Sequence, residues 1–224
     1  MYQNKLKRAV KNALILGDSY STFAGYIPSG YAAYYSSADS EKTDVRHVEE
    51  TWWHILSKKA NVNIILNNSW SGSTVGYTGY GNSDCSSTSS FIHRFDELYD
   101  NGFFEKNDID TVFVFGGTND SWANVELGEP FLDEWKTSDL FRVLPAITYV
   151  IYNIRKTLPN VNVVFIINTD IKEQIGCAVK AASEKFDTSY VELKNISKNC
   201  GHPTIQGMKE IAEQVLEYIN LNTP

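Results

Sequence analysis

Short apolar segments alternate along this chain with longer segments in which apolar side chains recur at helical spacing. The apolar segments cover residues 12–17, 63–68, 110–117, 161–168 and 188–193, and the amphipathic segments cover residues 46–61, 91–103, 140–160, 171–187 and 203–221. Strands that alternate with helices indicate a parallel sheet with helices on both faces, joined by right-handed crossovers. We therefore predict an α/β fold in three layers, α/β/α, around a five-stranded and mostly parallel sheet.

The chain of 224 residues shows no internal repeat, low-complexity segment or linker, which predicts one domain over residues 1–224. Its formal net charge of −7 argues against a nucleic-acid partner, because phosphate binding requires clustered Lys and Arg. No segment is long and apolar enough for a membrane span, and the first apolar segment reads as a core strand rather than a signal sequence. We expect a cytoplasmic protein, or a secreted or periplasmic one if a leader has been removed. The sequence does not indicate an oligomeric state.

The cysteines Cys85, Cys177 and Cys200 form an odd set without metal-type spacing. A disulfide framework is therefore not expected, although one pair stays open as an alternative. No pair of histidines has metal-ligand spacing beside a carboxylate, so we expect neither a metal ion nor a cofactor.

Clusters of polar residues follow the predicted strands at their carboxyl ends. Residues 17–19 read Gly-Asp-Ser, residues 67–72 Asn-Asn-Ser-Trp-Ser-Gly, residues 116–120 Gly-Gly-Thr-Asn-Asp and residues 199–203 Asn-Cys-Gly-His-Pro. Because the carboxyl ends of parallel strands meet at one edge of a sheet, we expect these clusters to gather there. Together they supply a hydroxyl, an imidazole, an amide and glycine N–H groups, which are the groups that acyl transfer uses.

These clusters resemble the four sequence blocks of the SGNH (GDSL-type) hydrolase family: GDSYS at 17–21, SWSGST at 69–74, GTND at 117–120 and NCGHP at 199–203. They stand in the family's order and span nearly the whole chain. The resemblance implies a flavodoxin-like SGNH hydrolase fold, with Ser19 as the nucleophile and His202 as the general base. It also implies an oxyanion hole formed by the backbone N–H groups of Ser19 and Gly72 and by the side-chain amide of Asn119.

The family pattern places an aspartate three residues before the histidine, whereas this chain has Asn199 there. The carboxylate fixes the imidazole tautomer and stabilises the imidazolium, and its replacement by Asn in a serine protease costs roughly four orders of magnitude in rate. Three interpretations stay open. Asn199 orients His202 as a member of the catalytic set; a carbonyl or a carboxylate from elsewhere does so, which leaves a Ser–His dyad; or the chain binds its ligand without hydrolysing it.

Structural roles compete with chemical ones for several of these residues. Ser19 could be only the N-cap of the segment that follows the strand, and Asp18 is expected to accept hydrogen bonds from neighbouring backbone N–H groups. Cys200 lies close to the predicted base but is a poorer candidate nucleophile than a serine at a strand end. Trp70 and Trp122 adjoin the blocks and are candidate substrate-binding residues, with packing as the competing explanation.

We predict a serine esterase that hydrolyses an ester through an acyl-enzyme intermediate. The substrate is expected to be an acetylated carbohydrate or another small ester, because the loops 20–45, 70–90 and 121–138 are rich in Tyr, Trp and Ser. The alternative is a non-catalytic carbohydrate- or ester-binding protein on the same scaffold. A flavodoxin-like binding domain is disfavoured because no turn between a strand and a helix forms a phosphate-binding loop.

Overall fold

The computed structural model describes residues 6–38 and 41–222. Its central sheet has five parallel strands in the order β2-β1-β3-β4-β5. The strands are β1 (Asn12–Gly17), β2 (Asn63–Ser69), β3 (Thr111–Phe115), β4 (Asn162–Ile167) and β5 (Ser189–Glu192). This is the strand order of flavodoxin-like sheets, and it confirms the predicted parallel sheet.

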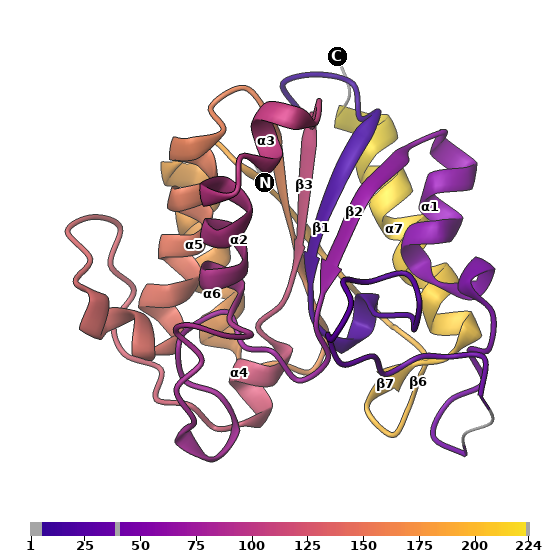
Figure 1. Ribbon diagram of the computed structural model, residues 1–224, viewed down its shortest axis with the longest axis horizontal. Helices are drawn as coiled ribbons and strands as arrows, with labels where there is room; N and C mark the ends of the chain where they lie inside the picture. Colours follow the sequence, from indigo (N-terminus) through magenta and orange to yellow (C-terminus); the bar gives the residue numbers. More distant parts are fainter. Residues whose placement is uncertain (1–5, 39–40, 223–224) are drawn as a thin grey trace.

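Helices cover both faces of the sheet, so the three-layer prediction is also confirmed (Figure 1). One face carries α1 (Trp52–Ala60) and α7 (Ile205–Asn222), and the other carries α2 (Phe91–Asp100), α5 (Val143–Thr157) and α6 (Glu173–Lys185). The shorter elements are α3 (Phe103–Lys106), α4 (Thr118–Trp122), and the 3-10 turns η1 (Ser19–Ser21), η2 (Val48–Glu50), η3 (Tyr80–Asn82) and η4 (Thr137–Phe141).

Alternate residues of each central strand enter opposite halves of the core. In β1, Ala13 and Ile15 pack with the α1 and α7 side, whereas Leu14 and Leu16 pack with the α2, α5 and α6 side. All four are fully buried. A strand covered on both faces needs apolar side chains at every position, which explains why the sequence shows a continuous apolar run here rather than an alternation.

The structure corrects the predicted elements in three places. The segment 46–61, expected as one helix, consists of η2 and α1, and the expected loop 118–138 begins with α4. A two-residue strand β6 (Lys198–Asn199) pairs with β7 (His202–Pro203) in a small antiparallel hairpin that was not predicted. Strands this short carry no periodicity in the sequence, so only the structure reveals them.

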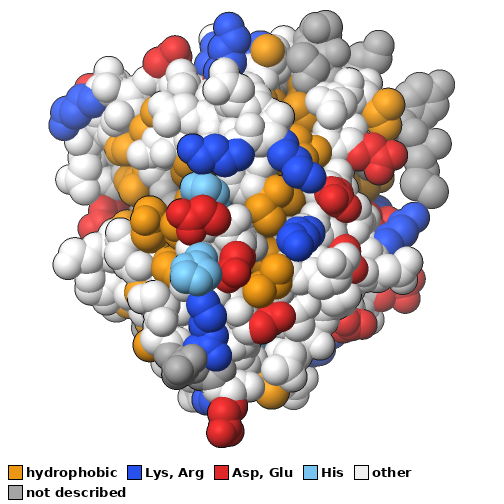
Figure 2. Space-filling model, turned by 90° about the vertical axis from the view of Figure 1, so that its right-hand side faces the viewer, with side chains coloured by type: hydrophobic (Ala, Val, Ile, Leu, Met, Phe, Trp, Pro, Cys, Tyr) orange, Lys and Arg blue, Asp and Glu red, His pale blue; other side chains and the backbone are white. Residues whose placement is uncertain are grey.

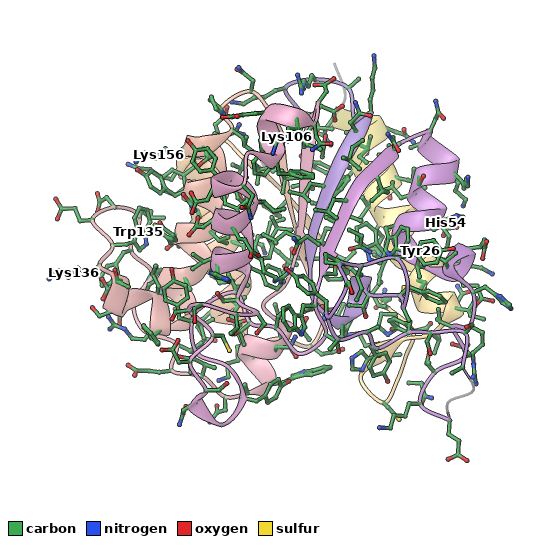
Figure 3. The ribbon with its side chains drawn as sticks, viewed as in Figure 1. Tyr26, His54, Lys106, Trp135, Lys136 and Lys156 are labelled. Atoms are coloured by element: carbon green, nitrogen blue, oxygen red, sulfur yellow. The ribbon has the colours of Figure 1, made fainter. Side chains whose placement is uncertain are left out.

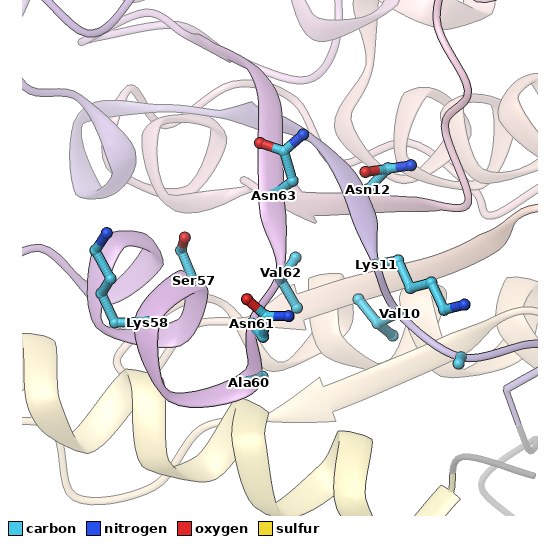
Figure 4. Close-up of a pocket in the computed structure, with 10 residues that line it drawn as sticks. Val10, Lys11, Asn12, Ser57, Lys58, Ala60, Asn61, Val62 and Asn63 are labelled. Atoms are coloured by element: carbon cyan, nitrogen blue, oxygen red, sulfur yellow. The ribbon is translucent and has the colours of Figure 1, made fainter.

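The carboxyl ends of the strands lie at the lower edge of the sheet in Figure 1, where η1, α4 and the β6–β7 hairpin gather. A hollow of about 660 Å³ lies at the opposite edge, beside the start of β1 and the turn between α1 and β2 (Figure 4). Its lining includes Lys11, Lys58 and Asn61, and it contains none of the residues of the four sequence blocks. The fold therefore gathers the candidate chemistry at the lower edge alone.

Two views show the sides of the molecule away from that edge. The face of α1 and α7 mixes basic and acidic side chains (Figure 2), and His54 lies on it, away from the strand ends (Figure 3). On the other side, the loop before η4 is held by Trp135, whose ring stacks on Tyr152 with 4.8 Å between ring centroids (Figure 3). No helix among the described residues combines the length and apolar character needed to cross a bilayer.

Two helical glycines in this fold should respond oppositely to alanine. A Cβ at Gly207 in α7 would clash with the carbonyl oxygen of Ser197, whereas a Cβ at Gly176 in α6 would meet nothing closer than 3.6 Å. We expect Gly207→Ala to lower the free energy of unfolding by about 1–3 kcal/mol, because the segment leading into the β6–β7 hairpin must move. Gly176→Ala should be neutral or stabilising by up to about 1 kcal/mol. Urea unfolding of both variants is the measurement, and equal stabilities would contradict the packing described.

Candidate active site

The turn after β1 places Ser19 at the end of the sheet. Gly17 is required by space, because a Cβ there would lie 2.5 Å from the Ser69 hydroxyl oxygen. Asp18 is the N-cap of η1, and its carboxylate accepts a hydrogen bond from the backbone N–H of Tyr20 at 3.0 Å. The cap is thus Asp18 and not Ser19, as expected for an Asp beside free N–H groups. A role as helix cap therefore does not explain the serine at position 19.

The β6–β7 hairpin places His202. Its two central residues, Cys200 and Gly201, have φ values of +48° and +78°, the pattern of a tight type I′ turn. The hydroxyl of Tyr20 donates to the Gly201 carbonyl at 2.5 Å, and the hydroxyl of Tyr35 donates to the Pro203 carbonyl at 2.9 Å. Two buried phenols therefore hold the hairpin, and one of them, Tyr20, belongs to the turn that carries Ser19 (residues 17–21, here the nucleophile turn).

The structure brings Ser19 and His202 into contact although 183 residues separate them. The Nε2 atom of His202 lies 3.0 Å from the Ser19 Oγ, and its Nδ1 atom lies 3.3 Å from the carbonyl oxygen of Cys200. A carbonyl can only accept, so Nδ1 carries the proton and Nε2 is the free acceptor for the Ser19 hydroxyl. This is the tautomer that a general base for Ser19 requires.

Asn199 does not take the place of the family's aspartate in this geometry. Its side chain is exposed, and its Nδ2 donates to the carbonyl of Lys42 at 3.4 Å rather than contacting His202. The hypothesis that Asn199 orients the imidazole is therefore not supported. The group that meets Nδ1 is the backbone carbonyl of Cys200, which corresponds to the second interpretation, a Ser–His dyad oriented by a carbonyl.

Aromatic rings enclose the imidazole of His202. The ring of Tyr34 stacks on it, with 3.6 Å between centroids and 6° between planes. Trp122 lies 5.5 Å away at 70°, and Tyr20 lies 5.4 Å away. The rings restrict rotation of the imidazole, so its orientation does not depend on a hydrogen-bond partner alone. Tyr34 had not been singled out, since nothing in the sequence marks one tyrosine among the 13.

The predicted oxyanion groups follow three neighbouring strands, β2, β1 and β3, at their carboxyl ends. Gly72 occupies a turn in which the Ser73 N–H donates to the Trp70 carbonyl at 3.2 Å, and its φ of +83° favours glycine. Asn119 is the second residue of α4, a helix whose N-cap is Gly117. Its Nδ2 donates to the Ser73 carbonyl at 2.9 Å. The backbone N–H groups of Ser19 and Gly72 donate to no acceptor among the described residues. They remain available to a developing negative charge.

Of the two predicted substrate contacts, Trp122 is 41% exposed beside His202 and Trp70 is partly exposed. The ring of Trp70 stacks with that of Tyr31 at 4.1 Å between centroids, and the backbone N–H of Trp70 donates to the Gly17 carbonyl at 3.1 Å. Trp70 thus lies beside the nucleophile turn and begins the turn that contains Gly72 (residues 70–73, here the oxyanion turn), and Trp122 lies beside His202. Their role as substrate contacts stays a prediction.

A fully buried arginine, Arg94 of α2, joins the segments that carry these groups. Its guanidinium donates to the carbonyl of Gly17 at 3.1 Å, to the amide oxygen of Asn68 at 2.8 Å and to the hydroxyl of Ser73 at 3.1 Å. Burial lowers the pKa of Arg94 to about 10, and the negative charge of Asp18 opposes that change. The guanidinium is therefore still a cation at neutral pH.

Two buried acids, Asp18 and Asp120, flank the residues of the site in the sequence. Burial raises the pKa of Asp18 to about 7, although the N–H of Tyr20 acts against the rise, and the nearby charge of Asp120 adds to it. Burial also raises the pKa of Asp120 to about 6, while the backbone N–H groups of Val75 and Gly76, at 3.0 Å and 3.4 Å, lower it. Asp120 is thus a backbone anchor for the segment after the oxyanion turn.

Comparison with known proteins agrees with this geometry. The family model described as GDSL-like Lipase/Acylhydrolase matches residues 11–219. The chain belongs to this family. The family comprises lipases and acylhydrolases, so the GDSL-like chain is a hydrolase in the broad sense. A comparison with curated proteins found no match.

Solved structures give the same assignment. A candidate GDSL-like lipase from Bacteroides ovatus matches with a TM-score of 0.86 and 37% identity over 96% of this chain and 100% of that chain. A second one, from Bacteroides uniformis, matches with a TM-score of 0.86 and 35% identity over 95% and 96% of the two chains. A family two carbohydrate esterase from Clostridium thermocellum shares the fold at a TM-score of 0.65 and 15% identity, over 97% of this chain and 64% of that chain.

The contacts of Asn199 generate a first prediction for this GDSL-like site. Because its exposed side chain does not reach His202, Asn199→Ala should leave kcat/KM within about twofold of wild type on p-nitrophenyl acetate. Asn199→Asp should give no large gain, since the Cys200 carbonyl already meets Nδ1. A tenfold gain for the aspartate variant, or a tenfold loss for the alanine variant, would show that position 199 orients the base after all. Ser19→Ala serves as the blank.

The environment of His202 generates a second prediction, on pH. Burial lowers the pKa of His202, the Cys200 carbonyl opposes this, and the charge of Lys198 lowers it further. A base must be neutral to work, so kcat/KM should rise with pH to a plateau, with the midpoint below about 6.5. Lys198→Met should move that midpoint to higher pH, whereas Lys180→Met, which removes a charge paired with Glu192, should not. A midpoint unchanged by Lys198→Met would contradict this electrostatic account.

Proposed function

We propose that the chain is a serine esterase that works through an acyl-enzyme intermediate. The observation that carries the proposal is the 3.0 Å contact between the Ser19 Oγ and the His202 Nε2, with Nδ1 held by a carbonyl. In the first step Ser19 attacks the ester carbonyl while its proton passes to Nε2. In the collapse of the tetrahedral intermediate the imidazolium returns that proton to the leaving alcohol.

Water completes the cycle. His202 takes a proton from the water as its oxygen attacks the acyl group on Ser19, and the proton then returns to the serine oxygen as the carboxylic acid leaves. In both halves of the reaction the negative charge develops on the carbonyl oxygen. We assign the N–H groups of Ser19 and Gly72 and the amide of Asn119 as donors to that oxygen, and one such donor is worth about 3–4 kcal/mol of barrier.

An acetylated carbohydrate is the substrate class that the surroundings favour. Half-exposed aromatic rings border the site, among them Trp122 at 41% exposure and Tyr80 at 47%. A hollow of about 430 Å³ adjoins the Tyr80 segment and is lined mostly by polar side chains, including Asn82, Glu126 and Arg142. Aromatic faces beside polar groups suit a sugar, which presents both C–H faces and hydroxyls. The carbohydrate esterase among the structural matches is consistent with this substrate, although at 15% identity it shares only the fold.

The second candidate is a non-catalytic binder of carbohydrates or esters. The observation that favours it is the neutral Asn199 in place of the family's aspartate, because an imidazolium without a carboxylate is less well stabilised. The contact of Ser19 with a correctly oriented imidazole argues the other way, since a binding protein has no need of it. Turnover decides between the two.

Ser19→Ala should lower kcat on p-nitrophenyl acetate by at least about 10³-fold, because it removes the hydroxyl that contacts the imidazole. Wild type should prefer acetylated xylan fragments to p-nitrophenyl esters of long acyl chains, and a fluorophosphonate should label the peptide that contains Ser19. Background rates that are equal for wild type and Ser19→Ala would support the binding protein instead. Efficient turnover of long-chain esters without a preference for acetylated sugars would reject the substrate class alone.

A further inference from the structure

The segment between β2 and α2 presents Tyr80 to the oxyanion residue Asn119. The Tyr80 hydroxyl donates to the Asn119 Oδ1 at 2.9 Å. Tyr80 opens η3, whose next two residues, Gly81 and Asn82, have φ values of +64° and +60°. This sharp turn projects the phenol from a segment that has no regular secondary structure on either side.

The contact determines how the amide of Asn119 is used. Its Oδ1 accepts from Tyr80, and one hydrogen of its Nδ2 goes to the Ser73 carbonyl at 2.9 Å. An amide nitrogen carries two hydrogens, and among the described residues nothing else accepts from it. The second N–H is therefore left for a ligand. The Ser73 carbonyl can only accept, so exchanging the amide oxygen and nitrogen would place two acceptors against each other.

We propose that Tyr80 is a positioning residue for ester hydrolysis, one that holds the Asn119 amide so that its second Nδ2–H faces the developing oxyanion. This inference rests on the proposed function, since an oxyanion forms only if the chain hydrolyses an ester. The hydrogen bond also polarises the amide, because donation to its oxygen makes its N–H groups better donors. Tyr80 acts through Asn119, and its ring remains part of the site's rim.

The contact is separable from the folding of its segment. The Gly79 N–H donates to the Ser83 carbonyl at 2.8 Å, and the Cys85 N–H donates to the Tyr77 carbonyl at 2.7 Å. The Thr78 hydroxyl donates to the Phe141 carbonyl at 2.7 Å and ties the segment to η4. Because these bonds involve no atom of the Tyr80 side chain, Tyr80→Phe should keep the segment in place while removing only the hydroxyl.

The test compares Tyr80→Phe with wild type on p-nitrophenyl acetate. We expect kcat to fall about fivefold to tenfold, the equivalent of one net hydrogen bond, with KM within twofold and the melting temperature unchanged. Tyr99→Phe is the matched control, because Tyr99 is 57% exposed on α2, and it should match wild type. A fall in activity that appears only as a higher KM would make Tyr80 a substrate contact and would overturn the inference.

A double-mutant cycle separates positioning from a general structural effect. If Tyr80 works through Asn119, adding Tyr80→Phe to Asn119→Ala should cost no further kcat. An equal loss in both backgrounds, or no loss in either, would overturn the inference while the Ser19-dependent turnover of wild type still upholds the proposed function. Absence of Ser19-dependent turnover in wild type would reject both together.

Discussion

The site depends on one buried cation. The guanidinium of Arg94 is out of contact with water, and burying a charge costs several kcal/mol unless hydrogen bonds replace its hydration. It finds those partners on the ends of β1 and β2 and on the turn that contains Gly72. The segments that carry Ser19 and the oxyanion donors are thus attached to a single planar group on α2. They cannot separate without leaving that charge unsatisfied.

Burial changes the pKa values of the titratable groups near Arg94 in opposite directions. It raises the pKa of Asp18 and Asp120, because a carboxylate is the charged form of an acid, and it lowers the pKa of His202, because an imidazolium is the charged form of a base. Burial therefore favours the neutral imidazole, which is the form that a general base needs. The acids behind it serve as anchors for backbone N–H groups rather than as partners of the imidazole.

The sequence was sufficient for the sheet, because strand periodicity determines it, and for the contact of Ser19 with His202, which the resemblance to the SGNH family implied. It was misleading for Asn199, since a position in a motif does not fix the direction of a side chain on a two-residue hairpin. The contributions of Arg94, Tyr34 and Tyr80 were not predictable. Each depends on contacts between residues far apart along the chain, and a lone Arg or Tyr in an amphipathic or irregular segment has no distinguishing pattern.

The stack of Tyr34 on His202 has an electrostatic consequence for a base that lacks a carboxylate partner. The face of a phenol ring is the negative pole of its quadrupole, and the imidazole lies 3.6 Å from it, centroid to centroid. When the imidazole takes a proton, this contact becomes a cation–π interaction, which contributes about 0.5–2 kcal/mol. This cation–π attraction adds to the stacking that already positions the neutral ring, and in the proposed reaction it would lower the energy of the state in which the imidazole is protonated. If His202 is the base as proposed, an uncharged side chain supplies part of the stabilisation that the family's aspartate gives by its charge.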